Sequence, residues 1–140
     1  MTPDGAVSVI SEALRLGLSG AEFLRDLGPA RVAAACNGIG PEWLPEALRE
    51  KLSKWLALFI LPADIHDCRF SYCNDGTELG FWSANNELER NCLLVADAWY
   101  AWCNPMRYLA RRGGRLVAAA CQRYGWSAWR QAYAKKEEVK

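Results

Sequence analysis

Apolar residues recur at spacings of three and four along most of the chain, which is the spacing of one face of an α-helix. The first such stripe contains Val9, Ile10, Ala13 and Leu14, and it closes at Gly20. Two short helices are expected next, over residues 21–27 and 32–36. Runs of β-branched residues and sustained period-two alternation are missing, so strands are not predicted.

The middle of the chain predicts three longer helices. The first covers residues 45–60, and its apolar stripe contains Leu48, Leu52, Trp55, Leu56 and Phe59. We expect Pro62 to break this helix and to open the second, which covers residues 63–73 and carries His66 and Asp67. After the turn at Asn74-Asp75-Gly76, the third helix covers residues 78–102.

The C-terminal part predicts helices over residues 106–112 and 116–124, separated by a hinge or kink at Gly113-Gly114. An aromatic tail helix around Trp126, Trp129 and Tyr133 follows, and residues 135–140 are expected to fray. We therefore predict one all-α domain over residues 1–140, a small helical bundle. Two antiparallel helices in it, residues 63–73 and 78–102, would carry the candidate site.

Charge is distributed unevenly along the chain. The formal net charge is +1, yet residues 1–103 hold about 8 Lys and Arg against 14 Asp and Glu, whereas residues 104–140 hold about 9 against 2. A basic C-terminal third of this kind favours a polyanionic partner. An anionic lipid surface, a nucleic acid and the acidic first part of the chain itself all fit, and a solvated helix surface is the plainer interpretation.

The N-terminal residues lack a basic region followed by a long apolar core, and no apolar run is long enough to span a bilayer. We expect the protein to be cytoplasmic as synthesised, with export by another route left open. The six cysteines are accordingly expected to be reduced thiols, although an even number also permits disulfides.

Two segments carry candidate chemistry. In the first, residues 36–42, glycines spaced by one residue allow backbone carbonyls to face a hard cation such as calcium, but the same pattern is common in turns between helices. The second holds His66, the only histidine, next to Asp67. Adjacent side chains on a helix point about 100° apart, so Asp67 cannot orient His66 and the two would have different roles. Asp67 would bind a cation and His66 would handle a proton.

Asn85 falls inside the apolar stripe of the helix over residues 78–102, four residues after Phe81 and three before Leu88. A buried amide needs a hydrogen-bond partner. If this helix packs antiparallel to the one that carries His66, the Asn85 amide would bond one imidazole nitrogen and fix the tautomer. An asparagine at the edge of the stripe that reaches solvent is the alternative.

The stretch NGIGPEWLP…ADIHD…AN…NC, within residues 36–92, resembles the phospholipase A2 superfamily, and most closely its compact bacterial, phage and parvoviral members. The resemblance implies that His66 is the general base of a calcium-dependent ester hydrolase acting on phospholipid. It also implies that Asp67 is a Ca²⁺ ligand beside the carbonyls of Gly38, Ile39 and Gly40, and that Asn85 supports the histidine. The basic, aromatic residues 104–140 lie outside the resemblance.

Two residues depart from the family's pattern. The supporting aspartate is Asn85, and the tyrosine four residues after the histidine is Phe70. A catalytically inactive relative that binds lipid or a protein is therefore an alternative to an enzyme. If the partner is a membrane, the side chains expected to insert are Trp43, Trp55 and Phe59.

Two further function classes are weighed. A nucleic-acid-binding helical domain would use the arginines of residues 107–115. A zinc domain would draw on Cys36, His66, Cys68, Cys73 and Cys92, whose spacings are irregular.

Overall fold

The computed structural model describes residues 1–36 and 45–138, and every regular element within these ranges is helical. The prediction of an all-α protein is confirmed. The elements are α1 (Pro3–Arg15), α2 (Ala21–Leu27), α3 (Pro29–Ala35), α4 (Glu46–Leu58), α5 (Ile60–Cys68), the π-helical turn η1 (Arg69–Cys73), α6 (Glu78–Trp99), α7 (Pro105–Tyr124) and α8 (Trp126–Glu138).

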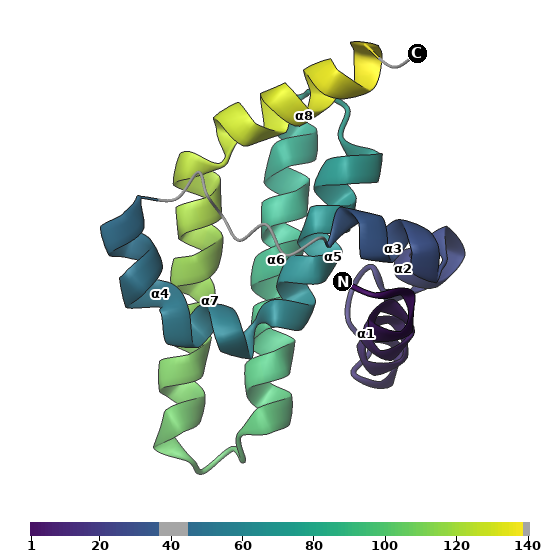
Figure 1. Ribbon diagram of the computed structural model, residues 1–140. Coiled ribbons are helices and arrows are strands. Elements are labelled where there is room, and N and C mark those ends of the chain that lie inside the picture. Colours follow the sequence, from purple (N-terminus) through teal and green to yellow (C-terminus); the bar gives the residue numbers. More distant parts are fainter. Residues whose placement is uncertain (37–44, 139–140) are drawn as a thin grey trace.

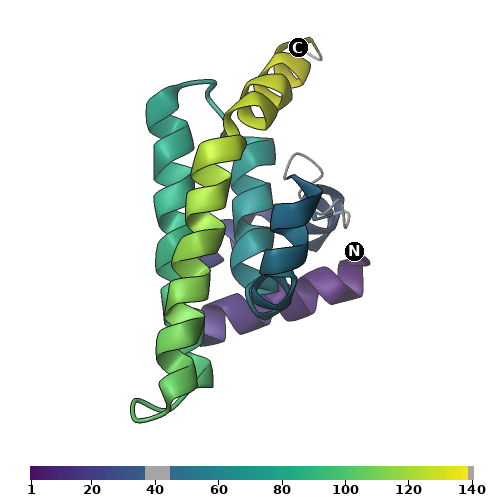
Figure 2. The same ribbon diagram turned by 90° about the vertical axis from the view of Figure 1, so that its left-hand side faces the viewer.

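Two long helices, α6 and α7, form an antiparallel hairpin against which the other elements pack (Figure 1). Helix α5 lies along α6, and α4 lies against α7. The short helices α1, α2 and α3 pack together beside α5, and α8 crosses the end of the hairpin where α7 finishes (Figures 1 and 2). The helix that carries His66 therefore has neighbours on both sides, and its side chains are largely buried.

The predicted hinge at Gly113-Gly114 is wrong, because α7 runs without interruption through both glycines. Both are buried, and each gives a neighbour room to approach. A Cβ on Gly113 would collide with the Trp55 indole, and one on Gly114 would stand 2.7 Å from the Cys92 Cβ. The pair thus serves close helix packing, with α4 on one side and α6 on the other.

The boundary at Pro62 also differs from the prediction. Helix α5 begins at Ile60, and Pro62 is its third residue. A proline is tolerated there because the first turn of a helix has no intrahelical partner for its N–H groups. The helix predicted to reach residue 102 ends at Trp99, which leaves Trp102 in the turn before α7.

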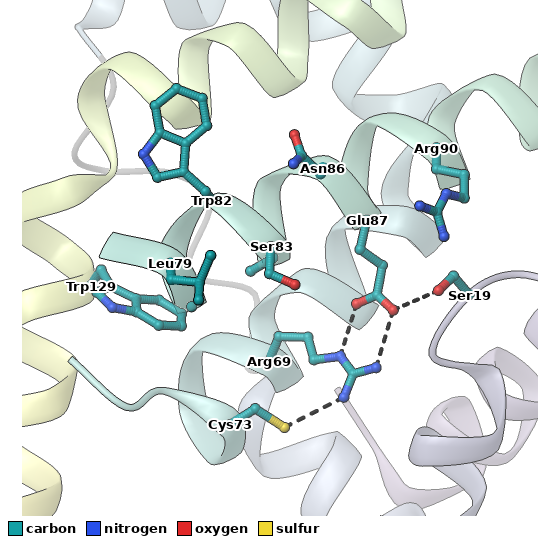
Figure 3. A pocket seen from close by; sticks show the side chains of 12 residues that line it. Ser19, Arg69, Cys73, Leu79, Trp82, Ser83, Asn86, Glu87, Arg90 and Trp129 are labelled. Carbon is teal, nitrogen blue, oxygen red and sulfur yellow. Dashed lines mark hydrogen bonds and ion pairs between the residues drawn. The ribbon is translucent and has the colours of Figure 1, made fainter. Parts of the chain in front are cut away.

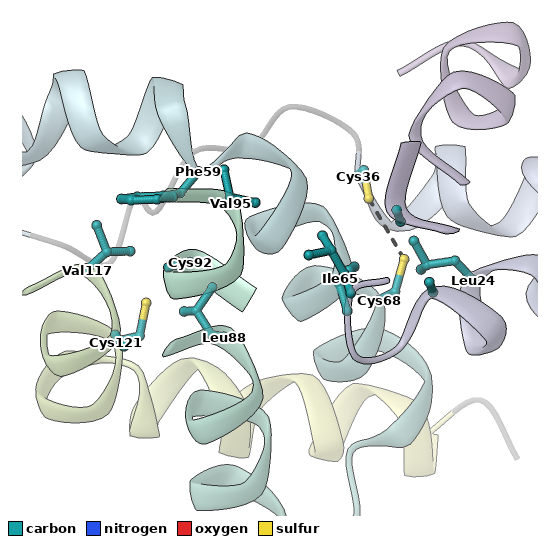
Figure 4. Packing of buried hydrophobic residues seen from close by; sticks show 14 of the residues in the cluster. Leu24, Cys36, Phe59, Ile65, Cys68, Leu88, Cys92, Val95, Val117 and Cys121 are labelled. Carbon is teal, nitrogen blue, oxygen red and sulfur yellow. Dashed lines mark hydrogen bonds between the residues drawn. The ribbon is translucent and has the colours of Figure 1, made fainter. Parts of the chain in front are cut away.

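The structure describes two of the three aromatic residues named as possible membrane anchors. Phe59 is 1% exposed and packs beside Cys92, Val95 and Val117 (Figure 4). Trp55 is half-buried against Gly113. The expected insertion of Phe59 is wrong for that reason, that of Trp55 stays a prediction, and Trp43 lies outside the described residues. No described helix has the length and apolarity that crossing a membrane requires.

Part of the basic charge of the C-terminal third is paired inside the molecule. Asp97 of α6 accepts from Arg107 Nε at 2.8 Å and from Arg111 Nη1 at 2.5 Å, and Arg115 Nε lies 3.8 Å from Glu89. The acidic part of the chain is thus one partner of the basic part.

Buried polar side chains of α6 tie the surrounding elements to it. Asn91 is fully buried; its Oδ1 accepts from Ser19 N at 2.9 Å and its Nδ2 donates to Ser19 O at 2.8 Å. These two bonds satisfy the backbone N–H and C=O of Ser19, in the turn between α1 and α2, as a neighbouring backbone would. Asn85, one and a half turns earlier on α6, faces α5 and α7.

Candidate functional site

His66, on α5, is 6% exposed and lies against α6. Its Nε2 is 2.9 Å from Asn85 Oδ1, so the hydrogen bond expected between these two side chains is present. Asn85 Nδ2 in turn donates to Gln122 Oε1 on α7 at 2.9 Å. The three side chains form a line of hydrogen bonds across three helices, which we call the buried line.

The buried line fixes the tautomer of the imidazole. With the Asn85 amide nitrogen engaged by Gln122, the Asn85 oxygen faces His66 and accepts from Nε2–H. The proton then sits on Nε2, and the lone pair of Nδ1 remains free to take a proton.

Burial keeps this imidazole neutral. Removal from water lowers the pKa of His66 to about 4, against smaller opposing effects from the Asn85 hydrogen bond and the negative charge of Glu87. A neutral imidazole at pH 7 has the protonation state of a general base. A low pKa also means that the imidazolium, once formed, has little compensation in its surroundings.

Two carboxyl groups of α5 lie near His66 in sequence and share a face three residues apart. Burial raises the pKa of Asp67 to about 7, and the nearby negative charge of Asp64 adds to the effect. Burial likewise raises the pKa of Asp64 to about 6. No lysine or arginine of the described residues forms an ion pair with either group, so this face of α5 has the electrostatic character that favours a bound cation.

The other calcium ligands suggested by the resemblance, the carbonyls of Gly38, Ile39 and Gly40, lie outside the described residues. The residue that precedes this segment is held firmly. Cys36 Sγ lies 3.8 Å from Cys68 Sγ (Figure 4). It donates to Asp64 O at 3.4 Å, and Cys36 O accepts from the terminal amine of Met1 at 3.2 Å. Cys36, the last described residue before that segment, therefore lies beside Asp64 of α5.

The cysteines do not form a zinc centre within the described ranges. No group of three or more His, Cys, Asp or Glu that could hold a metal ion occurs there, and all six cysteines are free. The hydrogen bond between Cys36 and Cys68, together with burial, raises the pKa of the Cys36 thiol. Cys36 is therefore an interior thiol in its protonated form, and Cys68 is buried beside it.

Two aromatic rings pack around His66, Phe70 of η1 directly and Trp129 of α8 behind it. The Phe70 ring centroid lies 4.4 Å from that of His66, and Trp129 of α8 packs edge-on against Phe70 at 4.8 Å. Tyr72 takes no part, because its hydroxyl donates to Arg31 O at 3.0 Å. Gln122 and Trp129 were both missed by sequence reasoning. Gln122 follows Ala118 by four residues in the buried stripe of α7, and the pattern that singled out Asn85 applies equally to it.

A separate pocket of about 590 Å³ lies on the other side of α6 (Figure 3). Arg69 crosses it to Glu87, with Arg69 Nε to Glu87 Oε2 at 2.8 Å, and Ser19 Oγ donates to Glu87 Oε1 at 2.8 Å. We call Arg69 and Glu87 the open pair. The lining of this pocket includes neither His66 nor Asp67.

The fold and the site together define a helical protein with a neutral buried histidine beside an acidic helix face. No protein-family model, curated protein or solved structure matches this chain.

Proposed function

We propose that this protein is a calcium-dependent ester hydrolase of the phospholipase A2 type, acting on phospholipid. The observation that carries the proposal is the buried line, which leaves one nitrogen of a neutral histidine free to accept a proton next to a helix face rich in carboxyl groups.

His66 is the general base. Its Nδ1 takes a proton from the attacking water, and the Asn85 oxygen holds the ring in place through Nε2–H. Gln122 keeps the Asn85 amide from turning, because a reversed amide would place two donors opposite each other at His66 and two acceptors opposite each other at Gln122. The three side chains thus set the direction in which the proton moves.

Asp67 is the described residue that would hold calcium, and the raised pKa values of Asp64 and Asp67 support this assignment. Burial outweighs the terminal ammonium near Asp64, and no positive charge lowers the pKa of Asp67, so a divalent cation would supply the compensation that these carboxylates lack. Calcium bound there would polarise the ester carbonyl and stabilise the developing negative charge. The carbonyls of Gly38, Ile39 and Gly40 complete the proposed ligand set.

The support of His66 by an amide in place of a carboxylate favours slow turnover. Asn85 accepts one hydrogen bond but brings no negative charge to the imidazolium. Phe70, against the other face of the ring, adds no hydroxyl to the network. The second candidate, a lipid-binding module without catalysis, rests on these same two contacts.

The test is calcium-dependent release of fatty acid from short-chain phospholipids, measured for the wild type, His66→Gln and Asp67→Asn. Asp26→Asn is the control, since Asp26 is an exposed carboxylate on α2. We expect release in calcium and none in chelator. Both site variants should lose about a hundredfold or more, and the control should match the wild type. If the wild type releases nothing, but calcium raises its melting temperature through Asp67, the binding module is correct. No release and no effect of calcium on the melting temperature would reject both the hydrolase and the binding module.

A further inference from the structure

Exposed aromatic residues gather at the tip of the α6–α7 hairpin, residues 99–109, which we call the hairpin tip. Trp99 is 69% exposed, Trp102 is 78% exposed and Tyr108 is 70% exposed; Met106 and Leu109 are exposed beside them. Both ribbon views show the connection between α6 and α7 projecting beyond the other helices (Figures 1 and 2). Large apolar side chains that are scattered singly need no explanation, but several together at one projecting end do.

The shape of the hairpin tip does not depend on these aromatic side chains. Asn104 caps α7, its Oδ1 accepting from Met106 N at 2.9 Å, and its own N–H donates to Ala101 O at 2.9 Å. Asp97 binds Arg107 and Arg111 at the base of the tip. The backbone is thus held by polar contacts, while the indole and phenol rings are left to contact something outside the molecule.

The chemistry of the hairpin tip matches the headgroup layer of a bilayer. Indole and phenol rings are apolar bodies with one polar group, and they concentrate at membrane–water interfaces. Arg112 is exposed one turn away, and α7 carries more positive charge than its two partners on α6 neutralise. This excess complements anionic headgroups.

Other partners fit less well. A stable dimer needs about 20–30 residues on each side, and a projecting turn of eleven residues offers a smaller, convex surface. Nucleic acid requires many phosphate contacts, and Arg107 and Arg111 are already engaged by Asp97.

We propose that the hairpin tip docks on the surface of a bilayer that contains anionic lipid, with Trp99, Trp102 and Tyr108 at headgroup level. The choice of lipid as partner rests on the proposed function, but docking and hydrolysis are separable. Asn85 precedes Trp99 by fourteen positions on one helix, or about 21 Å at the rise of an α-helix. Changes at the tip therefore leave the buried line intact.

The test uses the two exposed cysteines, because the other four are buried. A polarity-sensitive fluorophore is attached to Cys103 at the tip in a Cys73→Ser background, and to Cys73 in a Cys103→Ser background. Vesicles of ether-linked phosphatidylcholine and phosphatidylglycerol, which have no ester to hydrolyse, are added in chelator. We expect the emission of the Cys103 label to shift to the blue and that of the Cys73 label to stay unchanged.

The matched variants are a triple substitution, Trp99→Ser with Trp102→Ser and Tyr108→Ser, and the single substitution Trp82→Ser. Trp82 is also exposed but lies near the opposite end of α6. Vesicle partitioning of the triple variant should fall on the order of a hundredfold, and that of Trp82→Ser should not change. Calcium-dependent hydrolysis of a soluble short-chain phospholipid should be the same in both variants as in the wild type.

Three results would overturn the docking proposal. The first is that the wild-type protein does not bind the vesicles, and the second is that the triple variant binds them as well as the wild type does. The third is that, without lipid, the molecular mass of the wild type increases with protein concentration while that of the triple variant does not. The last would identify the tip as a contact between copies. Vesicle binding through the tip without any hydrolysis of the soluble substrate would keep the docking surface and reject the enzyme.

Discussion

Two polar networks join α6 to the α5–η1 segment, and they are built in opposite ways. The buried line, at Asn85, is made of neutral groups, and His66 and Asn85 in it are shielded from water, while Gln122 is half-buried. The open pair, at Glu87, is made of a carboxylate and a guanidinium at the edge of a pocket (Figure 3). Only two positions on α6 separate them. The comparison indicates that exposure to water decides whether a polar contact between helices is made by neutral groups or by charged ones.

The carboxyl groups make the same point. Burial alone would raise the pKa of Glu87, but the hydrogen bonds from Arg69 and Ser19 outweigh it and leave the pKa below its ordinary value. Asp67 is half-buried without such a cation among the described residues, and removal from water raises its pKa to about 7. A carboxylate with a partner supports structure, whereas one without a partner is available to bind a cation.

The largest effect is expected from giving the buried line a charge. Asn85→Asp should raise the pKa of His66 from about 4 to above its ordinary value of 6.5, because the new carboxylate stabilises the imidazolium. The acid limb of the activity profile should move with it, and the rate at neutral pH should rise as the base becomes stronger. The imidazole signal of the single histidine, followed by NMR through a pH titration, measures the shift.

The control for that variant is the same substitution one residue along. Asn86 is exposed on the pocket side of α6, and Asn86→Asp should leave the His66 titration nearly unchanged. Equal shifts in the two variants would mean that general negative charge, and not the hydrogen bond of the buried line, controls the histidine.

The second effect is on the free energy of unfolding when Asp67 or Glu87 is replaced by its amide, and the two replacements should act in opposite directions at pH 8. The folded pKa of Asp67 is raised, so its contribution is lost as pH rises through about 7; Asp67→Asn in chelator should gain about 1–3 kcal/mol at pH 8. The folded pKa of Glu87 is lowered, so its contribution is present above 4.5 and is lost on acidification. Glu87→Gln should therefore lose about 1–2 kcal/mol at pH 8 and less at pH 4. Urea unfolding at both pH values measures the two, and changes of equal sign at pH 8 would contradict the contrast.

Helix periodicity was enough to predict the all-α fold and to single out Asn85 inside an apolar stripe. The bond between His66 and Asn85 also required the two helices to pack antiparallel, and the structure decides for it against an asparagine that reaches solvent. Gln122 obeys the same rule on α7. It was not predicted, because it lies outside residues 36–92, where the resemblance singles out candidate site residues. Glu87 and Arg69 could not be predicted as a pair, since long charged side chains on a helix surface have many alternative partners.

Glycine and tryptophan show where a single sequence misleads. Gly113 and Gly114 have the pattern of a hinge, but close packing against Trp55 and Cys92 is an equally good reason for a small residue, and it is the one that applies. Trp55 was placed in an apolar stripe and also named as a possible membrane anchor, and it lies half-buried against α7, whereas Trp99 and Trp102 are exposed. Periodicity says which residues share a face, and only the packed helices say which face is covered.

The smallest expected effect is that of the open pair on the pKa of His66 in the buried line. The negative charge of Glu87 raises the pKa of His66, as the least of its three influences. Glu87→Gln removes that charge and frees the positive charge of Arg69 from its partner, and both changes disfavour the imidazolium. The pKa of His66 should therefore fall, by less than Asn85→Asp raises it. Glu89→Gln is the control, since Glu89 is half exposed and lies next to Arg115. The same NMR titration separates the cases: a rise in Glu87→Gln, or an equal fall in both variants, would show that the open pair has no specific influence on the histidine.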